Sequence, residues 1–366
     1  MGAGPWDVSM VRDYSAIVER DPELERQGRG RGGCGCPVMD VTVVAGFLLL
    51  LAVVALLVVS VCHPVYFPVL VLSLCLAVQA LRYPPVPLEV AQQVLRPNGR
   101  LSVVAHRGGG YDAPENTLGA IRKAAENNAT GVELDLEFTS DGFPILMHDR
   151  TVDRTTDGIG SLDHLTFEDV RKLNPAAKHR LHKNFPNEKV PTLEEAIVES
   201  LKNNMTIYFD VKGHAIQASA ALKKMYQEYP ELYTKSIVCS FDPLVIFKMK
   251  QVDKNVATAL THRPWRLSFF GNGKPKFHDY RQYWYMLLDI ILDWSLHAFL
   301  WKFFGISAFL MQKNFISMDY IRFWAERGVE VVAWTVNYSD EKRYYEKILH
   351  CIYITDSLIE KCSPAS

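Results

Sequence analysis

The chain has 366 residues, with 40 lysines and arginines against 41 aspartates and glutamates, and 48% of its residues are hydrophobic. The formal net charge of −1 and the lack of a basic stretch interleaved with aromatic residues exclude a typical nucleic-acid-binding protein. The length is sufficient for one α/β barrel of about 250 residues together with additional segments. The 7 cysteines are scattered and show no zinc-binding spacing.

Residues 1–40 are polar, charged and rich in glycine, which predicts a disordered tail. Residues 41–62 contain no charged side chain. A run of about 20 apolar residues is long enough to span a bilayer, so we expect a transmembrane helix here rather than a cleaved signal peptide. Residues 63–96 contain a second, shorter apolar block (67–81) and a linker. This block either spans the membrane, lies in its interface or caps the domain that follows.

Residues 97–366 alternate between apolar strands and helices, which predicts a TIM (β/α)8 barrel with its active site at the C-terminal ends of the strands. Eight strands are expected, several of them continuous apolar runs typical of a buried parallel sheet: 101–106, 131–137, 144–148, 205–211, 237–241, 256–261, 307–311 and 330–336. The helices expected between them include 115–127, 192–203, 215–228, 243–251 and 318–327.

Two insertions interrupt this alternation. Residues 150–191 form a long polar connection with one short helix near 166–173. Residues 263–306 are rich in aromatic side chains, and their apolar pattern is broken by Asp289, Asp293, His297 and Lys302. Such charges argue against a membrane span and favour an amphipathic helix pair that lies on the membrane or covers the barrel mouth. Ordinary packing of this segment against the barrel is the alternative.

Short signals bear on the membrane topology. Three arginines precede the first apolar run, Arg26, Arg29 and Arg31, so the positive-inside rule places the N-terminus in the cytoplasm. We expect glycosylation at the sequons of Asn128 and Asn204, which lie just before strands at the bottom of the barrel, but not at Asn337, which ends a strand on the catalytic face. We therefore expect an integral protein of the endomembrane system or plasma membrane, with the barrel lumenal or extracellular. One span places the barrel across the membrane from the N-terminus, whereas two spans place it on the same side. Cys351 and Cys362 could form a disulfide in an oxidising compartment.

The residues that suggest chemistry lie close together in the sequence. The first expected strand ends on His106 and Arg107, the second carries Glu133 and Asp135, and a short third strand ends on His148. Because side chains two apart in a strand point to the same side, both carboxylates can bind one Mg²⁺ or Ca²⁺ ion. Paired carboxylates, two histidines for proton transfer and an arginine for phosphate are the parts of a metal-assisted phosphate site.

The motifs AHRGG, APENT, GVELDLEFTSDG, LMHD, FDVKGH and AWTVN closely resemble those of the glycerophosphodiester phosphodiesterase family. The resemblance extends from about the second apolar block to the C-terminus. It implies Mg²⁺-dependent hydrolysis of glycerophosphodiesters, such as glycerophosphoinositol or a glycerophospho-N-acylethanolamine, to glycerol 3-phosphate and an alcohol. Carboxylate ligands alone do not separate Mg²⁺ from Ca²⁺, so Ca²⁺ stays an alternative.

The motif FDVKGH adds a second cluster to this site. Asp210 and Lys212 share one side of their strand, and Asp210 can complete the metal ligands with Glu133 and Asp135. Members of the family often carry glutamate at the position of Asp210, so the ligand geometry differs in detail. Lys212 supplies a positive charge for the phosphate, and a structural salt bridge is its alternative role. Trp334 either stacks against the alcohol part of the substrate or fills the barrel.

His106 and His148 are the expected general acid–base pair, and Arg107 is expected to bind the phosphate through its guanidinium group. Which histidine is the acid stays open, as does the choice between water and a glycerol hydroxyl as the first attacking group. Glu115 and Asn116 are expected at the N-terminus of a helix. There they either cap the helix and support the metal ligands or contact the substrate.

Two other functions are weighed against this one. A lysophospholipase D of the same fold would take a lipid chain into the site, and a lipid-sized apolar groove beside the metal would favour it. A membrane scaffold that binds a signalling regulator is the hypothesis from another class. A scaffold without activity would be expected to lose catalytic groups, whereas six are present here: His106, Arg107, Glu133, Asp135, His148 and Lys212.

Overall fold

The computed structural model describes Val54 and residues 66–359. Contacts divide the chain into two compact units, Met1–Arg82 and Tyr83–Ser366. In the first unit, α3 (Tyr66–Leu81) is a helix of 16 residues. No helix in the described part of the chain combines the length and the apolar character that crossing a membrane requires. The predicted tail and the predicted transmembrane run, Val54 apart, lie outside the described residues.

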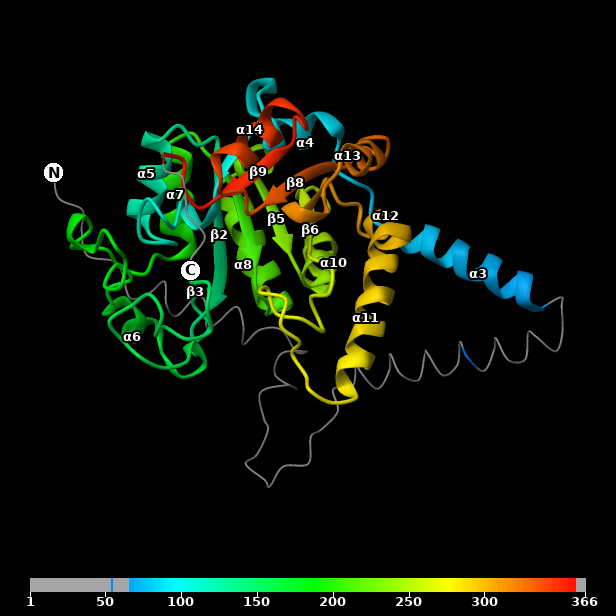
Figure 1. The fold of residues 1–366 in the computed structure, drawn as a ribbon, viewed down its shortest axis with the longest axis horizontal. Helices are drawn as coiled ribbons and strands as arrows, with labels where there is room; N and C mark the ends of the chain where they lie inside the picture. Colours follow the sequence, from blue (N-terminus) through cyan, green and yellow to red (C-terminus); the bar gives the residue numbers. More distant parts are fainter. Residues whose placement is uncertain (1–53, 55–65, 360–366) are drawn as a thin grey trace. The chain divides into compact units, whose positions relative to one another are not determined.

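Eight parallel strands of the second unit form a closed barrel (Figure 1). β1 pairs with β2 on one side and with β9 on the other, and this double pairing closes the sheet. In spatial order the strands are β1 (Val103–Ala105), β2 (Gly131–Phe138), β4 (Thr206–Val211), β5 (Ser236–Ser240), β6 (Thr258–His262), β7 (Ala308–Gln312), β8 (Glu330–Trp334) and β9 (Ile352–Thr355). The TIM barrel predicted from the sequence is confirmed.

One of the eight predicted barrel strands is wrong. The segment predicted at 144–148 forms β3 (Pro144–Leu146), which pairs antiparallel with the end of β2. Only five residues separate the two strands, and a connection that short makes a hairpin, because a parallel crossover needs a dozen residues or more. The eighth barrel strand is instead β9, which the sequence prediction lacked.

The outer helices follow the strands as a TIM barrel requires. They are α5 (Leu118–Glu126), α7 (Leu193–Lys202), α8 (Ala215–Glu228), α10 (Pro243–Val252), α13 (Met318–Ala325) and α14 (Ser339–Lys347), with a short α9 (Leu232–Lys235) between α8 and β5. α7 begins with a capping box, in which Thr192 and Glu195 satisfy each other's backbone N–H groups. At the end of the barrel opposite to the strand arrowheads (Figure 1), α4 (Leu88–Leu95) packs its buried Val94 and Leu95 against strand residues such as Val104.

Both predicted insertions are present. The connection 150–191 contains α6 (Phe167–Arg171), and its Val152 and Val170 share a small apolar cluster with Ile145 of β3. The segment 263–306 contains α11 (Arg281–Ser295), a π-helical turn (Leu296–Leu300) and α12 (Trp301–Phe304). These three pieces follow one another without a break, so the predicted helix pair is in fact one continuous helical segment.

Candidate active site

Three carboxylates converge at the C-terminal ends of neighbouring strands. Glu133 and Asp135 lie on β2, and Asp210 lies on β4 in register with Asp135. One oxygen from each carboxylate lies within 4.8 Å of the other two, and all three residues are buried. The predicted pairing of Glu133 with Asp135, and its completion by Asp210, therefore agrees with the geometry.

The charges of this cluster are only partly balanced. Lys212 Nζ lies 2.7 Å from Asp135 Oδ1 and 2.5 Å from Asp210 Oδ2. Burial and the charge of Asp135 raise the pKa of Glu133 to about 8. Burial also opposes ionisation of Asp135, but Lys212 and Arg107 outweigh it and hold the pKa of Asp135 below its usual range. Asp210 Oδ1 is buried and has no hydrogen-bond partner among the described residues. Hard oxygen ligands with spare negative charge fit a divalent cation.

Binding of a divalent cation is expected to depend on pH through Glu133. Between pH 4.5, the usual value, and about 8, the folded metal-free protein holds a proton on Glu133 that the unfolded chain releases. The stability of the metal-free protein therefore falls as pH rises through this window. A bound cation counteracts this fall, because it stabilises the ionised form of Glu133 in the folded protein. We expect MgCl₂ to raise the melting temperature more at pH 8.5 than at pH 6.5. Thermal unfolding of the wild type measures this, and Glu133→Gln is the control that lacks the titrating group. An equal rise in melting temperature at both pH values in the wild type would contradict the prediction.

His106 follows β1 and is oriented by residues from the far end of the chain. Its Nδ1 lies 2.5 Å from Asp356 Oδ1, and its Nε2 lies 3.9 Å from Glu133 Oε2. Asp356 is fixed in turn by Asn337, whose side-chain nitrogen donates to Asp356 Oδ2. Burial disfavours the imidazolium form, but Glu133 and Asp356 outweigh it and raise the pKa of His106. Sequence reasoning missed Asp356, because its proximity to His106 becomes apparent only once β9 is placed beside β1.

Arg107 lies between the carboxylate cluster and the loop that precedes α5. Its backbone N–H donates to Glu133 (2.8 Å), its Nη1 donates to Glu115 (3.0 Å), and its Nε lies 3.6 Å from Asp135. Asn116 donates to Asp135 Oδ2 at 2.7 Å and accepts from the Asp135 backbone N–H at 3.0 Å. Asn116 therefore orients the most buried carboxylate of the cluster.

The position expected for Glu115 and Asn116 at a helix N-terminus is corrected by the structure. The helix predicted from residue 115 begins at Leu118, and its N-cap is Thr117, whose hydroxyl accepts from the Ala120 N–H. The two residues precede the helix and point to charged neighbours instead. They are not capping residues: Glu115 accepts hydrogen bonds from Arg107 and Arg154, and Asn116 donates to Asp135.

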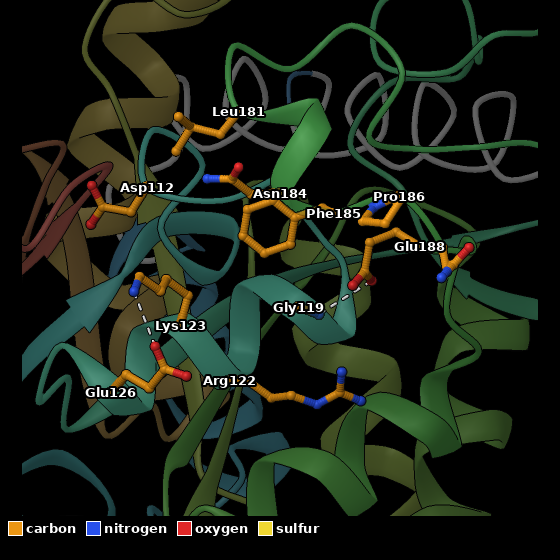
Figure 2. Close-up of a pocket in the computed structure, with 11 residues that line it drawn as sticks. Asp112, Gly119, Arg122, Lys123, Glu126, Leu181, Asn184, Phe185, Pro186 and Glu188 are labelled. Carbon is orange, nitrogen blue, oxygen red and sulfur yellow. Dashed lines mark hydrogen bonds and ion pairs between the residues drawn. The ribbon is translucent and has the colours of Figure 1, made fainter.

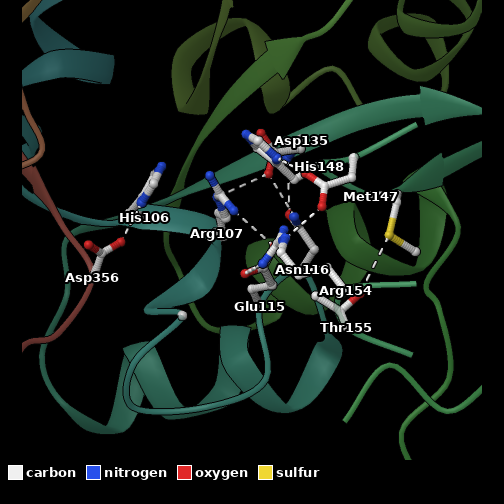
Figure 3. Close-up of polar contacts among 12 residues, drawn as sticks. His106, Arg107, Glu115, Asn116, Asp135, Met147, His148, Arg154, Thr155 and Asp356 are labelled. Atoms are coloured by element: carbon white, nitrogen blue, oxygen red, sulfur yellow. Dashed lines mark hydrogen bonds and ion pairs between the residues drawn. The ribbon is translucent and has the colours of Figure 1, made fainter. Parts of the chain in front are cut away.

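His148 is oriented by a second chain of charges (Figure 3). Its Nδ1 lies 2.6 Å from Asp149 Oδ1, and Asp149 Oδ2 accepts from Arg154 Nε at 2.5 Å. Arg154 also donates through both terminal nitrogens to Glu115, at 2.9 and 2.7 Å. Burial lowers the pKa of His148, against the opposing charge of Asp135. Asp149 and Arg154 were missed because their role depends on contacts in space, in which Arg154 of the polar insertion joins Asp149 to Glu115.

The remaining predicted substrate residues lie around the same end of the barrel. Trp334, at the end of β8, packs against the barrel core and meets the Phe241 ring edge-on at 5.4 Å between centroids.

Glu137 continues the alternation of Glu133 and Asp135 on β2 and is buried, with His214 Nε2 at 3.6 Å. Burial raises the pKa of Glu137. The period-two pattern of the strand was the signal for Glu137, and sequence reasoning did not use it.

Figure 2 shows a cavity of about 480 Å³ between α5 and residues 181–188. Its lining includes Arg122 and Glu188, and Glu188 accepts from the Gly119 N–H at 3.2 Å. None of the three clustered carboxylates, nor either histidine of the site, lines this cavity. The cavity is therefore separate from the residues predicted to carry the chemistry.

The predicted glycosylation and disulfide positions have different surroundings. Asn128 and Asn204 are exposed residues with positive φ (62° and 55°), each just after the end of a helix, where asparagine tolerates the left-handed conformation. Asn337 is occupied by its bonds to Asp356 and Thr355. Cys351 is buried and unbridged, and Cys362 lies outside the described residues.

Residues 106–360 match the glycerophosphoryl diester phosphodiesterase family. The chain belongs to this family. Its relatives include glycerophosphodiester phosphodiesterase 1 of Bos taurus, which is 61% identical over 293 residues, covering 80% of this chain and 88% of the relative. The Homo sapiens protein of the same name is 60% identical with the same coverage. The family resemblance inferred from the six motifs is thus confirmed. The same motifs also predict similarity to this vertebrate protein, and the identities of about 60% confirm that prediction.

Solved structures show the family fold. A phosphodiesterase of Oleispira antarctica, in complex with the product sn-glycerol-3-phosphate, has a TM-score of 0.56 at 21% identity, covering 70% of this chain and 92% of that chain. A glycerophosphodiester phosphodiesterase of Agrobacterium tumefaciens has a TM-score of 0.54 at 20% identity, covering 70% and 97%. Both likenesses concern the barrel, and at this identity they establish the fold alone.

Proposed function

We propose that the protein hydrolyses glycerophosphodiesters to glycerol 3-phosphate and an alcohol. The observation that carries this proposal is the buried cluster of Glu133, Asp135 and Asp210, which lies at the same end of the barrel as Arg107 and both histidines. Relatives about 60% identical over most of the chain are named for this activity, and a structural relative forms a complex with its product sn-glycerol-3-phosphate. Glycerophosphoinositol and glycerophospho-N-acylethanolamines are the proposed substrates.

The proposed reaction forms one P–O bond to the attacking oxygen, of water or of a glycerol hydroxyl, and breaks the P–O bond to the leaving alcohol. Where the glycerol hydroxyl attacks, water then opens the resulting cyclic phosphate to give glycerol 3-phosphate. We assign His148 as the base that accepts the attacking proton, since its lowered pKa keeps it neutral near pH 7. We assign His106 as the acid that protonates the leaving oxygen, since its raised pKa favours the protonated form. Arg107 binds a non-bridging phosphate oxygen. A cation bound by Glu133, Asp135 and Asp210 would neutralise charge on the phosphate.

The cofactor and the cellular setting are proposed on sequence grounds. Mg²⁺ is the proposed ion, supported by the all-oxygen ligands and the family, with Ca²⁺ as the alternative. Residues 41–62 are proposed as the membrane anchor, supported by a charge-free run of apolar residues. We also propose an endomembrane or plasma-membrane location with a lumenal or extracellular barrel. Glycans are proposed on Asn128 and Asn204, and the exposure of these two asparagines supports that part of the proposal.

Arg154 is expected to be a positioning residue for this reaction. It binds Glu115 and Asp149 at once, and these carboxylates in turn contact Arg107 and His148. We expect Arg154→Ala to lower kcat by about 10- to 100-fold, because both catalytic side chains lose a support. Arg154→Lys should recover only part of the loss. It keeps the positive charge, but an ammonium group lacks the planar fork that reaches both carboxylates. Steady-state kinetics of both variants, with melting temperatures, test this, and wild-type kcat in Arg154→Ala would contradict it.

A second candidate activity, lysophospholipase D, is favoured by one specific observation. A groove of about 380 Å³ lies at the C-terminal ends of β6 and β7 and is lined by Trp265, Phe269, Phe270, Met286 and Phe315, among others. An apolar groove on the catalytic side of the barrel suits the chain of a lysophospholipid. A scaffold role for a signalling regulator would be an addition to catalysis, because the catalytic groups are all present.

The test of the proposed function is release of glycerol 3-phosphate from glycerophosphoinositol by purified protein. Wild type, Glu133→Ala and His148→Ala are each assayed with Mg²⁺, with Ca²⁺ and with EDTA. We expect activity in the wild type that EDTA and both substitutions abolish. A folded, metal-loaded wild type that is inactive on this substrate and on a lysophospholipid would overturn the enzyme assignment.

A further inference from the structure

Helix α11 exposes far more apolar surface than the other barrel helices. Seven of its 15 residues are exposed and apolar: Tyr283, Trp284, Leu287, Leu288, Ile290, Ile291 and Trp294. By contrast, α7, α8 and α10 each expose one large apolar side chain, namely Val198, Ile216 and Leu244. A contiguous apolar surface of this kind on a soluble domain marks a place of interaction.

The orientation of α11 is fixed by polar contacts on its inner side. Asp289 is buried and accepts hydrogen bonds from the backbone N–H groups of Leu267 and Ser268, both at 2.8 Å, and from the Ser268 hydroxyl. Asp293 lies 2.8 Å from Nε2 of the buried His262 at the end of β6. The acids of the helix therefore face the protein and its apolar residues face outward. Rotating the helix to hide the apolar face would break the buried contacts of Asp289 and the pairing of Asp293 with His262.

The exposed face has the composition of a membrane-interface helix. Tyr283 and Trp284 lie in its first turn and Trp294 in its last, with leucine and isoleucine between them, and amphipathic aromatic rings favour the headgroup level. Arg281, paired with Asp279, begins the helix, and the exposed Lys302 lies in α12. A helix of 15 residues is about 22 Å long, shorter than the roughly 30 Å hydrocarbon core, so it fits a position along the surface.

The chain enters the barrel unit beside this segment. Tyr83, where the unit begins, donates its backbone N–H to the Phe303 carbonyl of α12 at 2.9 Å, and its ring meets Phe247 at 5.8 Å. The charge-free run 41–62 ends only about twenty residues earlier in the sequence. A bilayer that holds this run is thus tethered to the barrel at a point next to α12, which favours lipid over a protein as the occupant of the apolar face.

The apolar face also continues toward the catalytic end of the barrel. In Figure 1, α11 begins on the side to which the arrowheads of β5 and β6 point. Met286 of α11 lines the apolar groove at the ends of β6 and β7, together with the exposed Trp265, Phe270 and Phe315. A surface that contacts lipid through α11 would therefore lie close to the mouth of the active site.

We infer that the exposed face of α11 is a lipid-docking surface, on which the barrel lies against the bilayer that anchors its own N-terminal segment. The inference rests on the membrane attachment proposed above and not on the catalytic activity. It gives the apolar insertion a function: the active-site mouth is held next to the lipid surface, from which substrates with an acyl chain can enter.

The test uses the full chain reconstituted in phosphatidylcholine vesicles with a polarity-sensitive fluorophore on a single introduced cysteine. Leu288→Cys places the probe on the docking face, and Val198→Cys on α7 is the matched control, since these two side chains are 46% and 47% exposed. The cysteines at 34, 36, 62, 75 and 362 are replaced by alanine, while Cys239 and Cys351 are buried. Ile291→Cys is a second probe site should Leu288→Cys fold poorly. Hydrolysis of soluble glycerophosphoinositol is measured separately, so that loss of activity and loss of docking are distinguished.

We expect the probe at 288 to shift to shorter wavelength in vesicles and to be quenched by lipids with a nitroxide on the acyl chain, more by a shallow than by a deep nitroxide. The probe at 198 should show neither effect. Equal behaviour of the two probes would overturn the inference. So would stronger quenching by the deep nitroxide, which indicates a spanning helix, or probe–probe energy transfer without lipid quenching, which indicates that a second copy covers the face.

Discussion

Replacing Asp135 by asparagine is expected to lower kcat/KM for glycerophosphodiesters by at least about 1,000-fold, because a metal site that loses a charged ligand loses several kcal/mol of transition-state stabilisation. Asp135 is fully buried, receives a hydrogen bond from Asn116 and pairs with Lys212. The substitution keeps the shape of the side chain and removes its charge. The measurement is release of glycerol 3-phosphate over a titration of Mg²⁺.

The matched control is Asp289→Asn, which changes another buried acid far from the carboxylate cluster in the sequence. Asp289 supports the loop before α11 through its hydrogen bonds to Leu267 and Ser268. This control should lower the melting temperature but leave the Mg²⁺ concentration for half-maximal activity near that of the wild type. An Asp135→Asn protein with kcat/KM within about 10-fold of wild type would remove Asp135 from the metal ligands.

His106→Ala and His148→Ala are expected to differ in their dependence on the leaving group. Each should lose about 100- to 10,000-fold in kcat on glycerophosphoinositol, as removal of a general acid or base does. On a glycerophosphate ester of p-nitrophenol, the leaving oxygen needs no proton. His106→Ala should then lose only about 10-fold, whereas His148→Ala should remain as impaired as before.

The comparison of the two esters is therefore a direct test of which histidine is the acid. The melting temperatures of both variants serve as the folding control. Recovery of His148→Ala, and not of His106→Ala, on the p-nitrophenyl ester would reverse the two assignments. In the wild type, the raised pKa of His106 and the lowered pKa of His148 predict an activity plateau that extends on both sides of the usual histidine value.

The barrel was predicted from local patterns, and its one wrong strand shows their limit. A continuous apolar run identifies a buried strand but not its partner. β3 was therefore counted as a barrel strand, although its short connection to β2 makes an antiparallel hairpin. β9 has only four residues and follows a strongly polar helix, α14, so its sequence signal is weak. Pairing with both β1 and β8 stabilises it.

The site was predicted best where its residues share one strand. Glu133 and Asp135 point together because the side-chain period of a strand is two, and Asp210 joins them through the register of β2 with β4. The partner of His106 could not be found in this way. Asp356 lies 250 residues from His106 in the sequence, and no local pattern connects two such positions.

The sequence by itself determined the family, the class of fold and the identity of the reactive groups, because motifs, strand periodicity and residue chemistry are local properties of the chain. Only the tertiary structure decided how those groups are tuned. Asp356 orients His106, and Asp149 orients His148. Because the two histidines differ in burial and in neighbouring charges, the pKa of His106 is raised and the pKa of His148 is lowered. The outward apolar face of α11 was likewise decided by long-range contacts, since Asp289 and Asp293 reach partners on a loop and on β6. Electrostatic tuning and helix orientation depend on distances in space, which adjacency in the sequence does not specify.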